Sequence, residues 1–323
     1  MSVRLLTIDQ LSLLRPDHLC EHVADAAAAL SAVSTIFDCH LLQRAPGQSL
    51  LTTWSTEQQQ QLARVDRTLF LRVVGGRDSE RGSIPDCFSV ESVPATDADV
   101  ENHISVSANR TDIDFEWTHL QPGPHDDRPV WTAAFLRAAV RAAATDQDQL
   151  VIVAALSTGD EGSTRFPSLL WEGAIRAPLW MTNCAEPGTR VSNPTGSFEV
   201  MDTILHRLSN LTHQSSSQPN LRRLAVVSQD PAPCIALTWK EVLGLRTPDF
   251  FFVQSRTDED QTALYSKPVD VWNVHNMTHE YPEIAESMAR QLHQTSQYRA
   301  FAQMNRDTPG KGPGSCDGRP ESS

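Results

Sequence analysis

The sequence lacks clusters of lysine and arginine, long apolar runs and a signal-peptide pattern. Its 40 acidic residues outnumber 27 basic ones, for a formal net charge of -13. That charge repels nucleic-acid phosphates and anionic lipid surfaces, because no local basic patch opposes it. No run of about 18 apolar residues could span a membrane, and Asp9 interrupts the N-terminal apolar run early. We therefore expect a cytoplasmic protein that binds neither nucleic acid nor membranes.

Paired cysteines and spaced metal-ligand histidines are also missing. None of the six cysteines lies in a C-x-x-C pair, and a chain of 323 residues needs no disulfide framework. Scattered cysteines of this kind are usually buried as small hydrophobic residues. His18, His40 and His119 lack metal-ligand spacing and are expected to be structural. Large aromatic side chains are expected in the core or in pocket walls, namely Trp117, Trp131, Trp171 and Trp180.

Apolar runs that fit strands alternate with stretches in which apolar residues recur at helical spacing. The pattern predicts strands at 3–8, 68–74, 114–120 and 150–156, and helices at 17–37, 57–65 and 131–144. The run at 150–156, LVIVAAL, has no polar residue, as expected for a strand covered on both faces. The alternation predicts an α/β protein with a doubly wound, mostly parallel sheet.

The pattern changes after residue 220. Short β-rich runs separated by turns, including CIALTWKEVLGLR and DFFFVQ, predict a smaller antiparallel unit, which a helix at 281–301 closes. The last stretch is rich in Gly, Pro and Ser and is expected to be a disordered tail. The sequence thus predicts an α/β domain at 1–220, a β-rich subdomain with a terminal helix at 221–305, and a tail at 306–323.

One segment, SLLWEGAIRAPLWM at 168–181, sets charged residues, a glycine and a proline at fixed offsets in an apolar stretch. It resembles a segment of the sulfatases of the alkaline phosphatase superfamily, where an aromatic residue precedes E-G-x-R-x-P and an apolar strand. Other stretches resemble family segments in the family's order, from residue 3 to about 300: VRLLTIDQL, FEWTHLQPGPHD, LVIVAALSTGDEG, SFEVMDTILHRLSNL and LYSKPVDVWNVHNMTHEYPEIAESM. The resemblance implies an alkaline-phosphatase-like sheet with a smaller C-terminal antiparallel β unit and a closing helix.

The E-G-x-R-x-P segment itself is interpreted as structural. Gly173 permits a turn, and Glu172 and Arg176 can pair across it. Pro178 suits an edge strand or the start of a strand, because proline cannot donate a ladder hydrogen bond. The segment is therefore expected to mark the fold rather than to perform chemistry.

The resemblance also implies a particular chemistry. The family's nucleophile is a formylglycine made from Cys or Ser in C/S-x-P/A-x-R, and a divalent cation held by aspartates assists it. In the corresponding stretch 43–53, QRAPGQSLLTT, no Cys or Ser stands before x-Pro-x-Arg, and no cysteine elsewhere has that context. Asp9 matches one metal aspartate, Asp160 is a loose match to a second, and His125 matches a sulfate-contacting histidine. The lysine expected before Trp171 is missing, and Arg165 lies there instead.

Two functional hypotheses follow. In the first, the chain is a pseudo-sulfatase, a binding or regulatory scaffold without cofactor. Here His125 is a vestigial substrate contact, and a small anionic ligand binds near His125 and Arg165. In the second, it is a metal-dependent sulfate- or phosphate-ester hydrolase, with Ca²⁺ or Mg²⁺ at Asp9 and Asp160. The nucleophile would then be one of three hydroxyl residues, Ser49, Thr52 or Thr53.

Plainer alternatives stay open at each of these positions. Asp9 would then cap the loop after the first strand, His125 would bond to loop backbone, and Asp160 would belong to a solvated turn. A different α/β fold is a third alternative, which the lack of a central, mainly parallel sheet would indicate.

Overall fold

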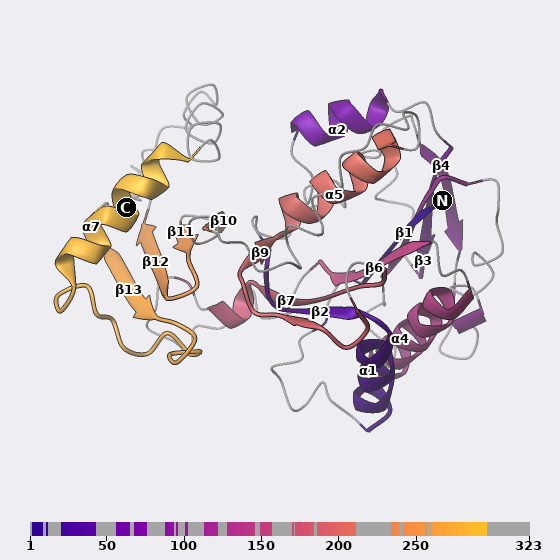
Figure 1. The fold of residues 1–323 in the computed structure, drawn as a ribbon, viewed down its shortest axis with the longest axis horizontal. Helices are drawn as coiled ribbons and strands as arrows, with labels where there is room; N and C mark the ends of the chain where they lie inside the picture. The colour runs from indigo at the N-terminus through magenta and orange to yellow at the C-terminus, as the bar shows by residue number, and fades with distance from the viewer. Residues whose placement is uncertain are drawn as a thin grey trace, which may run out of the picture.

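The computed structural model contains two sheets and the helices that cover them (Figure 1). It describes residues 2–8, 11, 21–42, 56–64, 68–75, 88–93, 95, 101–102, 113–121, 128–145, 149–156, 170, 172–183, 186–210, 234–239, 242–255, 258 and 260–295. None of the described helices has the length and apolar character needed to cross a bilayer.

The large sheet has nine strands among the described residues. Its order is β4 (Phe88–Val93), β3 (Leu69–Val74), β5 (Phe115–Leu120), β1 (Val3–Ile8), β6 (Leu150–Ala155), β7 (Arg176–Met181), β2 (Thr35–Leu41) and β8 (Arg190–Val191), and β9 (Thr195–Gly196) also pairs with β2. The five strands from β4 to β6 are mutually parallel, and β7 is antiparallel to both β6 and β2. The sheet is therefore mostly parallel, as the alternating pattern predicted.

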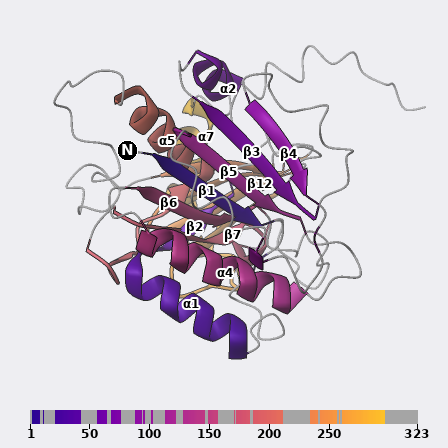
Figure 2. The same ribbon diagram turned by 90° about the vertical axis from the view of Figure 1, so that its right-hand side faces the viewer.

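Helices cover both faces of this sheet (Figure 2). Helices α1 (Glu21–Val33) and α4 (Arg128–Thr145) lie on one face, where Leu6 and Ile8 of β1 join their core. Helices α2 (Thr56–Ala63) and α5 (Ser197–Asn210) lie on the other, where Val3 and Leu5 pack with Ile204. Burial on both faces explains why β1, β3, β5 and β6 are fully buried along their lengths.

The C-terminal unit is an antiparallel meander of β10 (Ile235–Trp239), β11 (Val242–Arg246), β12 (Phe250–Ser255) and β13 (Thr262–Ser266), followed by α7 (Pro282–Gln294). Phe251 and Val253 point into the core that α1 and α4 share, whereas Phe252 packs beneath α7 with Leu245 and Met288. This alternation places the small sheet between the α/β unit and α7. The antiparallel unit and its closing helix are as predicted.

Three of the four tryptophans predicted for the core or pocket walls, Trp117, Trp131 and Trp180, are at most 2% exposed, and the fourth, Trp171, lies outside the described residues. Trp131 in the first turn of α4 lies against Gly75, just beyond β3. Gly75 has φ +86°, and a Cβ there would lie 2.5 Å from the Trp131 ring. Both the backbone conformation and the close approach require glycine. The contact seats the start of α4 against the end of β3.

The predicted helix at 17–37 is wrong at its C-terminal end. The helix ends at Val33, the Ser34 hydroxyl donates to the Leu30 carbonyl (2.6 Å), and the chain enters β2 at Thr35. β-Branched residues at 35 and 36 favour a strand, and the burial alternates over the first four residues of β2, as in a strand. The predicted boundary at 220 and the predicted tail lie outside the described residues.

Candidate functional site

Parallel pairing brings the carboxyl ends of several strands to one edge of the large sheet. The register sets Ile8 of β1 beside Leu120 of β5 and Ala155 of β6, and Leu120 beside Val74 of β3. Strand β2 runs in the same direction, because β7 is antiparallel to both β2 and β6. In open α/β sheets, ligands bind outside this edge. We therefore take it as the candidate functional site.

The predicted site residues follow these strand ends in the sequence. Asp9 comes directly after β1, His125 after β5 and Asp160 after β6. All three lie outside the described residues, as do Arg165 and the three candidate hydroxyl nucleophiles, so their roles stay predictions. Across the described part of the chain, no group of three or more His, Cys, Asp or Glu residues is placed to hold a metal ion.

A buried hydrogen-bond network holds the end of β1 in place. Trp117 Nε1 donates to Thr7 Oγ1 (2.8 Å), and Thr7 Oγ1 lies 3.0 Å from His119 Nδ1. Because the Thr7 oxygen accepts from the indole, its own proton can be donated to Nδ1. All three side chains are buried. The network fixes the backbone just before Asp9, and His119 has the structural role predicted for it.

His40 and Cys39, at the end of β2, are unsuited to acid–base or nucleophilic chemistry. Burial lowers the pKa of His40 to about 3, so its ring is neutral, 3.3 Å from the Thr195 hydroxyl. Burial, reinforced by the Glu172 carboxylate, raises the pKa of the Cys39 thiol to about 11. Burial also raises the pKa of Cys234. Both described cysteines therefore stay protonated, and neither provides a thiolate nucleophile at neutral pH.

The glutamate of the E-G-x-R-x-P segment lies in a buried cluster of charges. Glu172 opens a short 3₁₀ turn (Glu172–Ala174) before β7 and is 2% exposed. Its Oε2 lies 2.8 Å from Lys267 Nζ, and its Oε1 lies 3.5 Å from Arg246 Nε. Lys267 also donates to the Asn273 side chain, and Asn273 Nδ2 donates to the Leu170 carbonyl (2.8 Å). The cluster joins the α/β unit to the small sheet.

The predicted pairing of Glu172 with Arg176 is therefore wrong, because Glu172 bonds to cations of the C-terminal unit. Arg176 instead donates from Nε to the backbone carbonyl of Asp38 on β2 (2.7 Å). Burial lowers the pKa of Lys267, while Glu172 acts in the opposite direction by stabilising its charged form. Sequence spacing could not indicate the actual partners of Glu172, since Lys267 and Arg246 lie far along the chain.

Pro178 is not at an edge or at a strand start. It is the third residue of β7, which lies between β6 and β2. The register of β2 against β7 shifts between Phe37 and His40, so a β-bulge lies opposite the proline. A bulge tolerates the missing N–H, and Arg176 Nε supplies a donor for the Asp38 carbonyl. Arg176 and Pro178 thus act together at the bulge: Pro178 has no N–H to pair, and Arg176 supplies the hydrogen-bond donor for the Asp38 carbonyl.

Glu199, in the first turn of α5, was not singled out from the sequence. Its Oε2 accepts from the backbone N–H of Gly196 (2.9 Å), three residues earlier, as in a helix capping box. Burial raises its pKa to about 7, although the Gly196 hydrogen bond lowers it, and Asp202 raises it further. The sequence signal that could have identified this cap is the glycine three positions before the glutamate.

The raised pKa of Glu199 makes stability depend on pH. The unfolded state loses this proton near pH 4.5 and the folded state near pH 7, so its contribution is complete below pH 4.5 and is lost as pH rises through 7. From pH 5 to pH 8, wild type should lose on the order of 2 kcal/mol relative to Glu199→Gln. Urea unfolding of both proteins at each pH measures this difference.

Glu283→Gln is the matched control, because Glu283 is an exposed glutamate in the first turn of another helix, α7. Its carboxylate is exposed, so its removal tests what the loss of a glutamate does without burial. A Glu199→Gln difference between pH 5 and pH 8 no larger than that of Glu283→Gln would show that burial does not hold the proton on Glu199.

Solved structures share this fold, although no known family model and no curated protein sequence matches the chain. A putative sulfatase from Bacteroides thetaiotaomicron has a TM-score of 0.63 at 10% identity, covering 96% of this chain and 94% of that one. A phosphonate monoester hydrolase from Silicibacter pomeroyi has a TM-score of 0.59 at 12% identity, covering 94% and 95%. A protein solved with its substrate D-glucosamine-2-N,6-O-disulfate has a TM-score of 0.63 at 12% identity, covering 97% and 99%. The chain therefore has the fold of the sulfatases and the alkaline phosphatase superfamily, as its motif order predicted.

Proposed function

We propose that this chain is a sulfatase-fold protein that does not hydrolyse sulfuric esters and serves as a binding or regulatory scaffold. The observation that carries this proposal is the missing nucleophile motif: no Cys or Ser in the sequence is followed by x-Pro-x-Arg or x-Ala-x-Arg. Without that context the chain offers no residue for conversion to formylglycine. The protonated thiols of Cys39 and Cys234 support the same conclusion.

The ligand that we propose is a small anion at the strand-end edge, near His125 and Arg165. In the sequence, the two residues follow parallel strands, β5 and β6, whose carboxyl ends meet at this edge. A cationic guanidinium and an imidazole suit an anionic group. The disulfated sugar bound by one protein of this fold is consistent with an anionic ligand class.

A metal-dependent ester hydrolase is the second candidate. The strands before Asp9, Asp160 and the 43–53 stretch, namely β1, β6 and β2, all end at the same edge. A phosphonate monoester hydrolase also has this fold. Two carboxylates suit a hard cation such as Ca²⁺ or Mg²⁺, which would neutralise the ester oxygens when bound. In this chain Ser49, Thr52 or Thr53 would then attack the ester.

Turnover assays separate the two candidates. Purified protein is incubated with 4-nitrophenyl sulfate, 4-nitrophenyl phosphate and a phenylphosphonate monoester, each with Ca²⁺, Mg²⁺ or Mn²⁺ in excess. The scaffold proposal expects rates equal to buffer, because no activated nucleophile is present. It also expects no bound metal by elemental analysis and no increase in Tm with any of the three cations.

Asp9→Asn purified in parallel is the control for contaminating hydrolases. Turnover that is present in wild type and lost in Asp9→Asn would overturn the scaffold proposal and support the hydrolase. Alanine variants at Ser49, Thr52 and Thr53 would then identify the nucleophile. Equal traces of turnover in both proteins would indicate contamination and leave the scaffold proposal supported.

A further inference from the structure

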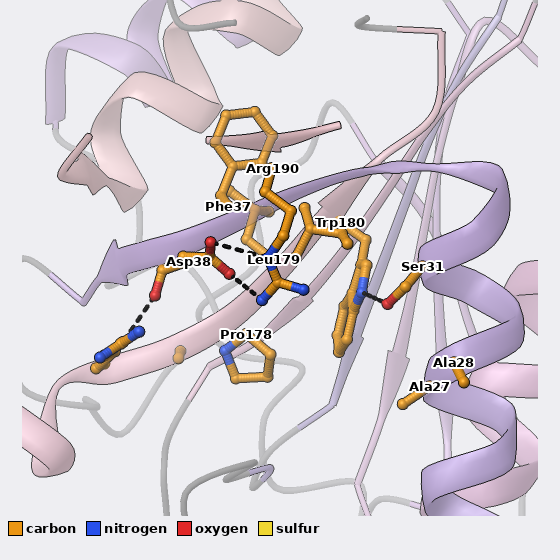
Figure 3. A pocket seen from close by; sticks show the side chains of 12 residues that line it. Ala27, Ala28, Ser31, Phe37, Asp38, Pro178, Leu179, Trp180 and Arg190 are labelled. Atoms are coloured by element: carbon orange, nitrogen blue, oxygen red, sulfur yellow. Dashed lines mark hydrogen bonds and ion pairs between the residues drawn. The ribbon is translucent and has the colours of Figure 1, made fainter. Parts of the chain in front are cut away.

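A cavity on the flank of the large sheet lies apart from the strand-end edge. It has a volume of about 310 Å³ and lies between α1 and strands β2, β7 and β8 (Figure 3). The β2 residues that line it, 36–38, are in the first half of that strand, whereas the candidate site begins beyond Leu41. The cavity is thus a second site on the same sheet.

One wall of the cavity is charged. Arg190 of β8 points at Asp38 (Figure 3) and donates to both of its carboxylate oxygens, from Nε at 3.1 Å and from Nη2 at 2.5 Å. Arg176 donates from Nε to the Asp38 carbonyl, and its terminal nitrogens have no partner among the described residues. Two guanidinium groups facing one carboxylate leave one net positive charge in this wall.

The facing wall is apolar. Ala27 and Ala28 come from α1, and Pro178 comes from the β-bulge region of β7. Trp180 lies between them, and its indole Nε1 already donates to Ser31 Oγ (3.0 Å) (Figure 3). The wall therefore offers hydrocarbon surface and no unused indole N–H.

We propose that this cavity binds a small monoanionic carboxylate that carries a flat apolar group, such as an aryl carboxylate. The carboxylate contacts Arg176 and the outer edge of Arg190, since guanidinium forks match carboxylate geometry. One net positive charge selects a monoanion over a dianion. The ring then lies against the apolar wall that Pro178, Trp180 and the alanines of α1 form, and the volume, at the small end of ligand pockets, admits one or two fused rings.

Titration calorimetry with 2-naphthoate tests the proposal. We expect saturable 1:1 binding, with 2-naphthamide and naphthyl phosphate binding at least about tenfold more weakly, because each mismatches the charge of the cavity. Arg190→Gln removes the net positive charge and should weaken naphthoate binding by about tenfold. Ala28→Phe should abolish binding by filling the cavity.

Two matched variants control for indirect effects. Ala29→Phe adds the same ring to a neighbouring exposed position of α1 that does not line the cavity. Arg137→Gln removes an arginine of α4 that donates from Nε and Nη2 to the carboxylate of Glu101, just as Arg190 donates from two nitrogens to the carboxylate of Asp38. Neither should change naphthoate binding, and Ala28→Phe should melt as Ala29→Phe does. No binding at millimolar naphthoate, equal binding of the amide, or full binding by Ala28→Phe would overturn the proposal.

Discussion

Glu172→Ala is expected to lower the free energy of unfolding by about 3–5 kcal/mol, because it leaves buried cations without their counter-charge. Lys267 and Arg246 are each 4% exposed, so water cannot replace the lost carboxylate. In a chain of this size the loss corresponds to a fall in Tm of about 4–7 °C. Thermal and urea unfolding followed by circular dichroism measure both quantities.

The double variant Glu172→Ala/Lys267→Met tests the cause. Removing one of the two stranded cations should recover part of the loss, which a general packing defect at residue 172 would not do. Glu186→Ala is the matched control, since Glu186 is exposed and should change stability by less than about 0.5 kcal/mol. A cost for Glu172→Ala as small as that of Glu186→Ala would show that the cluster does not hold the two units together.

Local pattern was sufficient to predict most of the sheet. Strands β1 and β6 are continuous apolar runs, and burial on both faces is the reason for their composition. The boundary between α1 and β2 was missed because no glycine or proline separates them. Ala32, Val33, Ile36 and Phe37 fit a helical stripe as well as a strand, so periodicity alone could not place the change at Ser34.

The sequence did not indicate which residues bond to each other when they lie far apart in the chain. The E-G-x-R-x-P segment was correctly interpreted as structural, but its bonds run to β2 and to the C-terminal unit rather than within the turn. Pro178 suggested an edge strand, and only the bulge in β2 explains its place in the middle of the sheet. The expected parallel pairing was enough to predict that the strand ends meet at one edge, whereas the roles of Asp9, His125 and Asp160 stay predictions.

Glu116→Ala is expected to cost about 3–5 kcal/mol, because Glu116 is the counter-charge of a buried arginine in the middle of the sheet. Arg4 and Glu116 are register partners on β1 and β5, on the face that α1 and α4 cover. Arg4 Nε lies 3.2 Å from Glu116 Oε2, and the two side chains are 5% and 4% exposed. Urea unfolding of the variant against wild type measures the loss.

A second Arg–Glu pair in the large sheet differs from the first in the burial of its glutamate. Arg72 and Glu91 are also register partners on neighbouring parallel strands, β3 and β4, but Glu91 is 41% exposed. Arg72 is itself only 4% exposed, but the Glu91 carboxylate faces solvent, so water can take its place beside the guanidinium and Glu91→Ala should cost only about 1 kcal/mol. A double variant Arg4→Met/Glu116→Leu should recover much of the Glu116→Ala loss, since an apolar pair needs no counter-charge. If Glu116→Ala costs no more than Glu91→Ala, burial of the charge does not set the contribution of the Arg4–Glu116 pair to stability. Side-chain packing between β1 and β5 would then have to account for that contribution.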